Sequence, residues 1–235
     1  MVIIVFPKYL HTIFALQSKN LALNQKKTSL EDNPQYLELL DRVGEIFRRH
    51  GLRSVTMDDV AGKLGISKKT LYKHFDNKRD LIEKSIIRFL ELEKKDLTKI
   101  REEAENAVEE MLLMGEYANK HLAELNPAAV YDARKYFPRS WVHLENYRHE
   151  FIYECILDNL ERGKETGLYR DDINPDIIAR MYTARMDMFF DPLIFPPGKY
   201  SLILIYQSFM DCHIRGIASS DGVAYLERHL KSANA

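Results

Sequence analysis

The sequence has few of the residues that cross-link or interrupt a chain. It holds 2 cysteines, Cys155 and Cys212, with 10 glycines and 8 prolines among 235 residues. Two distant cysteines outside any CxxC pair argue against a disulfide framework or a cysteine zinc site, and they fit a reducing cytoplasm. Stretches that alternate apolar and polar residues are also scarce, which argues against a sheet. We therefore expect a cytoplasmic, all-α protein.

The common catalytic motifs are missing as well. The sequence has no GxSxG, HExxH, P-loop or GxGxxG. His143, Glu145 and His149 do not place two histidines together on one helix face, so a solvated surface is favoured over a metal site. We expect no enzyme activity, no cofactor and no metal, with an all-helical enzyme kept as an alternative.

No apolar run is long enough to cross a bilayer, which takes ~20 residues. The apolar start, MVIIVFPKYLHTIFAL, is broken at Pro7-Lys8 and lacks the basic start and cleavage site of a signal peptide. We expect residues 1–33 to form a loosely ordered extension, or a true start site to lie downstream of them. A membrane-associating amphipathic segment is the less favoured alternative.

Charge is divided unevenly along the chain. Residues 34–90 carry 12 Lys and Arg against 8 Asp and Glu, whereas residues 91–235 carry 18 against 25. A basic segment before an acidic one indicates that only the first part meets a polyanion, although chance differences of this size are common.

Most of the chain shows apolar residues three and four apart, which predicts helices. Gly, Pro and Asn-Pro pairs mark the breaks between them. The expected helices span 34–50, 56–64, 67–75, 77–105, 107–125, a segment from 126–127 onward, 138–162, 175–191, 199–218 and 222–230.

Residues 56–75, TMDDVAGKLGISKKTLYKHF, predict two short helices joined by a turn. Thr56 and Asp59 have the spacing of a capping box, and Ser67 has the place of an N-cap. Gly65 stands where a left-handed turn is needed. Leu71 and Phe75 are four residues apart and therefore share one helix face, which we expect to point inward.

Cations and hydroxyls are left on the outer faces of this unit. They suit duplex DNA, because cations neutralise phosphates and the first residues of a recognition helix can touch base edges. The alternative is a helical hairpin with a solvated lysine face. The side chains concerned are Lys68, Lys69, Thr70, Tyr72, Lys73 and His74.

The segment from Gly51 to Ile86 resembles the DNA-binding region of the TetR family. The shared positions have fixed spacing within about 50 residues, 34 to 85, and Lys69 departs from the glycine found in many relatives. The matching residues are Gly51, Thr56, Asp59, Ala61, Gly65-Ile66-Ser67, Thr70-Leu71-Tyr72-Lys73-His74-Phe75, Lys78 and Leu81.

The resemblance implies a helix-turn-helix domain over 34–82 and a ligand-binding and dimerisation domain over 83–235. It implies phosphate contacts from Thr56, Ser67, Tyr72, His74 and Lys78, and places Lys68, Lys69, Thr70 and Lys73 in or near the major groove. For His74, a hydrogen bond within the motif remains the alternative. The partners implied are double-stranded operator DNA, a small-molecule effector and a second copy of the chain.

The last two long helices would form the dimer. The helix over 199–218 carries more apolar surface than one helix usually buries within its own subunit, although an ordinary core helix is the alternative. The residues expected at this interface are Leu202, Ile205, Tyr206 and Phe209.

Methionines and aromatic residues of the second domain are expected to wall an effector cavity, because Met adapts to varied ligands and Tyr and Trp offer polar tips. Residues at such spacing also form ordinary cores. The expected function is a repressor released by a hydrophobic or aromatic effector, with a helical binding protein that has no DNA role as an alternative. The cavity residues are Met111, Met114, Tyr117, Tyr131, Trp141, Tyr147, Phe151, Tyr182, Met186 and Phe189.

Overall fold

The computed structural model describes residues 33–196 and 198–233, so the expectations for residues 1–32 lie outside the described residues. Within this part the regular secondary structure is helical apart from one isolated β-bridge, Tyr169 to Ala218, which confirms the all-α class. The helices are α2 (Pro34–His50), α3 (Met57–Leu64), α4 (Lys68–His74), α5 (Lys78–Glu103), α6 (Ala107–Ala123), α7 (Pro127–Tyr136), α8 (Pro138–Asn146), the π-helix η1 (Tyr147–Ile152), α9 (Tyr153–Glu165), α10 (Pro175–Ala184), α11 (Met186–Phe189), α12 (Leu202–Ile217) and α13 (Ser220–Ala233).

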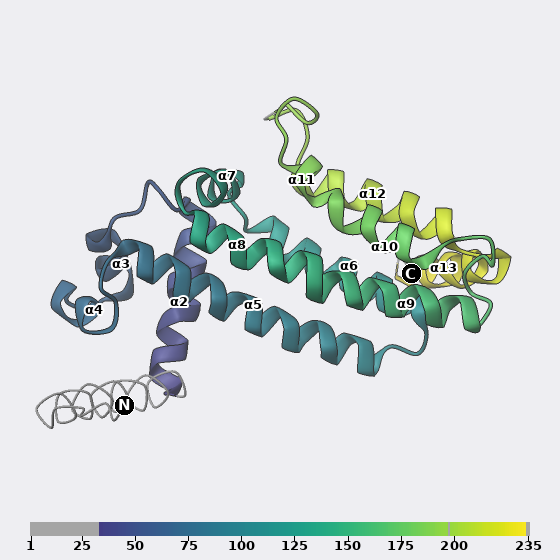
Figure 1. The fold of residues 1–235 in the computed structure, drawn as a ribbon, viewed down its shortest axis with the longest axis horizontal. Helices are drawn as coiled ribbons and strands as arrows, with labels where there is room; N and C mark the ends of the chain where they lie inside the picture. The colour runs from purple at the N-terminus through teal and green to yellow at the C-terminus, as the bar shows by residue number, and fades with distance from the viewer. Residues whose placement is uncertain (1–32, 197, 234–235) are drawn as a thin grey trace, which may run out of the picture.

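Helices α2, α3 and α4 lie together at one end of the molecule, and the start of α5 packs against them (Figure 1). Val43, Val60 and Leu71 are fully buried between these helices. The cluster also takes in Ala129 and Ala133 of α7. A small apolar core therefore holds the helix-turn-helix at this end of the molecule.

Local signals fix the turn of this unit as the sequence predicts. The Thr56 hydroxyl accepts from the Asp59 amide at 3.1 Å, and the Asp59 carboxylate accepts from the Thr56 amide at 2.8 Å. Gly65 has a φ of 70°, and Ser67 Oγ accepts from the Thr70 amide at 3.0 Å. The predicted capping box, left-handed glycine and serine cap are confirmed.

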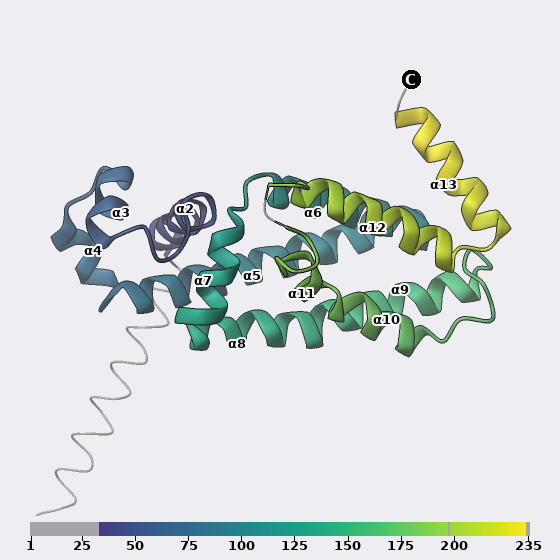
Figure 2. The same cartoon turned by 90° about the horizontal axis from the view of Figure 1, so that it is seen from above.

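The remaining helices form an elongated bundle into which α5 runs (Figures 1 and 2). α10 packs on α9, α12 on α6, and α5 on α8. α5 is continuous through residue 82, so no break in the backbone marks the predicted boundary between the two domains. The boundary stays a prediction.

Two helices that the sequence predicts as continuous α-helices are irregular in the structure. The helix expected over 138–162 continues to Glu165 and contains the π-helix η1, in which a wider turn shifts the register of the residues that follow. The helix expected over 175–191 is interrupted at Arg185, between α10 and α11. Both irregularities lie at the wall of the cavity described below.

A buried polar network joins α6 to α9. The Glu110 carboxylate accepts from Arg162 and from Asn159 Nδ2, the latter at 2.9 Å. The hydroxyl of Tyr169, 2.8 Å from Asn159 Oδ1, extends the network. The Tyr169 ring reaches this position only because Gly163 has no side chain, since a Cβ there would overlap the ring.

Replacing Gly163 by alanine should therefore lower the free energy of unfolding by at least about 1–3 kcal/mol, because the ring is buried and has nowhere to move. Gly62→Ala, at a helical glycine with open space around it, should instead raise it by about 0.5–1 kcal/mol. Urea unfolding followed by circular dichroism measures both. Equal effects of the two substitutions would contradict the overlap.

Candidate functional site

The outer surface of α4 is the first candidate site, and α4 lies at the end of the molecule (Figure 1). Lys69, Tyr72 and Lys73 are exposed, and Thr70 is half-buried. Lys68 is exposed too, but its ammonium is 2.8 Å from the Asp58 carboxylate. Within the part of the chain that the structure describes, Lys69 and Lys73 have no acidic partner, so their charge is free for a polyanion.

The two capping hydroxyls are exposed but already engaged. Thr56 Oγ1 donates to Asp59 Oδ2 at 2.7 Å, and Ser67 Oγ lies 2.8 Å from Thr70 Oγ1. These bonds position the N-termini of α3 and α4, where backbone amides point outward. A phosphate there would meet a preformed set of donors.

His74 and Lys78 are tied more closely to the motif than the other predicted contacts. The half-buried His74 ring lies 5.8 Å from the Tyr36 ring and 6.2 Å from the Phe75 ring. Lys78 Nζ donates to the Arg53 carbonyl at 2.9 Å, and burial lowers its pKa. Both side chains therefore already support the folded motif.

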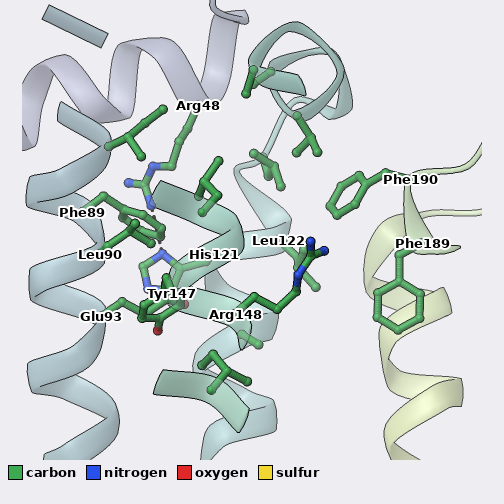
Figure 3. Close-up of a pocket in the computed structure, with 18 of the residues that line it drawn as sticks. Arg48, Phe89, Leu90, Glu93, His121, Leu122, Tyr147, Arg148, Phe189 and Phe190 are labelled. Carbon is green, nitrogen blue, oxygen red and sulfur yellow. Dashed lines mark hydrogen bonds between the residues drawn. The ribbon is translucent and has the colours of Figure 1, made fainter. Parts of the chain in front are cut away.

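The second candidate site is a cavity of about 300 Å³ with a mainly apolar wall (Figure 3). This volume lies at the lower end of the range typical of small-molecule pockets. The wall is formed by residues of α2, α5, α6, α7, α8, η1, α10, α11 and α12. The cavity thus lies between the helix-turn-helix and the bundle.

The structure brings together six of the ten predicted cavity residues. These six are Met114, Tyr117, Trp141, Tyr147, Tyr182 and Phe189.

Three of the other four do not line this cavity. Met111 is fully buried in the core, and Tyr131 is 56% exposed on α7. Phe151 stacks on Tyr147 with ring centroids 5.4 Å apart, behind the wall. The side chain of Met186 lies outside the described part. Helical spacing alone cannot separate these positions, because it does not reveal which face borders an empty volume.

Sequence reasoning missed every charged residue of the cavity wall. These residues are Arg48, Glu93, Arg148, Arg185 and Asp187, together with His121. No sequence signal separates Arg48 from its neighbour Arg49, which points outward and pairs with Glu124 at 2.7 Å.

Arg48 extends from α2 into the cavity wall (Figure 3). Its Nη1 donates to His121 Nδ1 at 2.9 Å, and its guanidinium carbon lies 5.0 Å from the centre of the Phe89 ring. Burial and the charge of Arg48 lower the pKa of His121. A neutral His121 accepting at Nδ1 therefore holds a cation of the helix-turn-helix against the bundle.

Glu93 of α5 faces the same end of the cavity (Figure 3). Burial raises the pKa of Glu93 to about 7, against the opposing influence of the Tyr147 hydroxyl and the Arg48 guanidinium. Removal from water penalises the charged carboxylate more than these two neighbours stabilise it.

Two further arginines, Arg148 and Arg185, also line the cavity. Arg148 Nη1 donates to Asp187 Oδ1 at 2.8 Å. Arg185, at the break between α10 and α11, lies against Tyr182 and Phe209.

The predicted interface residues on α12 divide between two environments. Ile205 and Tyr206 are buried in the subunit's own core, and Leu202 and Phe209 are half-buried. The apolar side chains left exposed on α10 and α12 are Ile177, Met181 and Leu204. Both helices lie along one edge of the molecule (Figure 1).

The described residues contain no group of three or more His, Cys, Asp or Glu side chains that could hold a metal ion. His143 Nε2 instead lies 3.2 Å from Glu83 Oε1. Among the same residues, no helix has the length and apolar character needed to cross a membrane.

Residues 39–84 match the family model described as bacterial regulatory proteins, tetR family. Over 151 residues the chain is 29% identical to the HTH-type transcriptional repressor KstR2 of Rhodococcus jostii, covering 61% of this chain and 72% of that protein. The curated relatives reported by these comparisons are transcriptional regulators.

Solved structures show the same fold. A putative transcriptional regulator from Saccharomonospora viridis in complex with choline has a TM-score of 0.63 at 19% identity, covering 77% of this chain and 96% of that one. The regulator FadR from Bacillus subtilis in complex with stearoyl-CoA has a TM-score of 0.55 at 16% identity, covering 77% and 99%.

The raised pKa of Glu93 predicts a pH-dependent stability. The folded state holds the proton more tightly than the unfolded state, so Glu93 lowers the free energy of unfolding as pH rises from about 4.5 to about 7. Glu93→Gln should remove this loss and raise the free energy of unfolding at pH 8 by on the order of 2 kcal/mol. Denaturant titrations of the Glu93→Gln variant and the unsubstituted protein at the same pH values measure this, because the contributions of all other groups cancel in the difference between the two proteins.

Glu102→Gln, an exposed position of the same helix, is the control and should change little. A Glu93→Gln profile parallel to that of the unsubstituted protein would show that Glu93 is charged in the folded state.

Proposed function

We propose that this chain is a regulator of the tetR family, whose model its residues 39–84 match, and that it binds operator DNA as a homodimer and is released by a small apolar effector. The observation that supports the effector's role is the composition of the cavity wall. Gly44, Phe47, Arg48 and Leu52 of α2 line it together with residues of the bundle. A molecule in this cavity therefore touches the helix-turn-helix directly.

Such an arrangement couples the two sites thermodynamically. The effector shifts the protein between two arrangements only if it binds one more tightly, and DNA affinity falls by the same difference in free energy. α2 and α5 are the elements that would move, since both line the cavity and both pack in the core of the helix-turn-helix. Release by the effector makes the protein a repressor of the genes next to its operator.

In this proposal α4 enters the major groove. Lys69, Thr70 and Lys73 reach base edges and nearby phosphates, with Lys68 available once it leaves Asp58. Thr56, Ser67, Tyr72, His74 and Lys78 contact the phosphate backbone, as the family resemblance implies. The free charges of Lys69 and Lys73 supply part of the salt-dependent affinity.

The second copy packs along α10 and α12. Two recognition helices must reach half-sites ~34–36 Å apart, which one subunit cannot do. Ile177, Met181 and Leu204 leave an apolar surface on these two helices that a two-fold partner would cover. Leu202 and Phe209 border this surface, whereas Ile205 and Tyr206 support it from inside.

The effector would have an apolar body. Apart from its few charged groups, the wall consists of aliphatic and aromatic side chains, among them Tyr117, Trp141 and Phe189. This class is supported by the likeness to a Bacillus subtilis fatty acid metabolism regulator and to the structure of Bacillus subtilis FadR in complex with stearoyl-CoA.

The DNA role is tested with duplexes that the full-length protein selects from a random-sequence library. Lys73→Ala should weaken binding and lower the slope of log K against log salt by about one, because one fewer counterion is released. Lys95→Ala, an exposed lysine of α5 remote from α4, is the matched control. An unchanged slope would remove Lys73 from the phosphate contacts, and failure to select any duplex would overturn the proposed function.

The dimer is tested at the exposed surface of α10. Met181→Glu places a charge on a 64% exposed apolar position, and a two-fold axis would bring it close to its own copy. We expect sedimentation equilibrium to show monomers and duplex affinity to fall by about tenfold or more. Val142→Glu, at a 49% exposed apolar position of α8, should leave the dimer intact. A dimeric Met181→Glu protein would exclude this surface from the interface.

A further inference from the structure

Arg185 is a buried cation in the wall of a mainly apolar cavity. Only 7% of the residue is exposed. Its guanidinium carbon lies 3.3 Å from the centre of the Tyr182 ring and 3.2 Å from that of the Phe209 ring. The two rings cover the guanidinium and favour its positive charge.

The rings do not satisfy its hydrogen-bond donors. The N–H groups of a guanidinium lie in its plane, and the face of an aromatic ring offers them at most a weak acceptor. Among the described residues, Nε and Nη1 of Arg185 have no acceptor in hydrogen-bonding geometry, and Nη2 reaches only the Met210 sulfur at 4.0 Å. The Tyr182 and Tyr206 hydroxyls favour the charge of Arg185 but do not offset its burial. Burial lowers the pKa of Arg185 to about 10, which leaves it charged at neutral pH. Unsatisfied buried donors on a charged group are costly to the folded protein.

The other charges of the cavity do not compensate for Arg185. Asp187 is taken by Arg148, at 2.8 Å. Glu93 is influenced by Arg48 rather than Arg185, and its raised pKa of about 7 leaves it partly protonated at neutral pH. Arg185 makes no ion pair with any described residue. The cavity therefore carries an excess positive charge close to an apolar volume.

We infer that the effector is amphipathic and anionic, with a carboxylate or phosphate group that pairs with Arg185 and an apolar body that fills the cavity. This inference rests on the proposed function, because it specifies the effector of the same site. An anionic oxygen would give the free donors of Arg185 their acceptor and neutralise the excess charge in a low-dielectric setting, where charge-assisted hydrogen bonds are strong. Phe189 and Tyr206, which line the cavity near Arg185, would contact the adjoining apolar segment.

The natural reporter is Trp141, the only tryptophan of the chain, because it lines the cavity. Its fluorescence is followed while full-length protein is titrated with straight-chain fatty carboxylates, alkyl phosphates and alcohols of matched chain length. We expect the better anion to bind about ten- to a hundredfold more tightly than the alcohol. Comparing carboxylate with phosphate identifies which anion the site takes.

Arg185→Met keeps the length and apolar stem of the side chain and removes its charge. We expect the variant to bind anion and alcohol equally and, without ligand, to melt at a higher temperature than the unsubstituted protein, since an uncompensated buried charge is gone. Arg180→Met, at an exposed arginine of α10 paired with Asp176 at 2.9 Å, should keep the anion preference.

A purely structural role for Arg185 makes the opposite prediction. A lower melting temperature for ligand-free Arg185→Met together with an unchanged anion preference would overturn the inference. Equal binding of anions and alcohols by the unsubstituted protein would overturn it as well. If the protein selects a duplex but shows no anion preference, only this inference is overturned. If it shows the anion preference but binds no duplex, the proposed function is overturned and the anion site is retained.

Discussion

The contact of Arg48 with His121 and Phe89 ties the helix-turn-helix to the wall of the cavity. Arg48 belongs to α2, whose other face packs in the small core that holds α3 and α4. A neutral imidazole accepts from it, so the contact has no full counter-charge and is easily altered by a new group nearby. The coupling that we propose between the cavity and α4 requires a contact with two alternative arrangements, because tightly packed cores do not deform continuously.

The cavity combines apolar walls with charges that a stable core would avoid. Glu93 is held with a pKa near 7, and Arg185 keeps two donors without acceptors. Both features reduce the stability of the ligand-free protein. Such costs are expected at binding sites, since a group fully satisfied by the protein has nothing left to offer a ligand.

The sequence predicts the helix-turn-helix well because its determinants are local. The Thr56 box, Gly65 and the Ser67 cap act over three or four residues, and each is found as expected. The cavity depends on how distant helices meet, so spacing could not tell Tyr147, which lines it, from Tyr131, which is exposed. The π-helix and the break at Arg185 were equally invisible, because neither is marked by proline or glycine.

The position of Arg185 connects the cavity to α12 as well as to the helix-turn-helix. Its guanidinium stacks on Phe209 of α12, and the Phe209 ring also stacks on His213. A ligand that draws Arg185 into an ion pair would change its contacts with Tyr182 of α10 and Phe209 of α12. Because residues of α2, α10 and α12 all line the cavity, it is adjacent both to the helix-turn-helix and to the helices where we propose the second subunit to pack. In the proposed dimer, a shift of Arg48 or Arg185 would change the spacing of the two recognition helices.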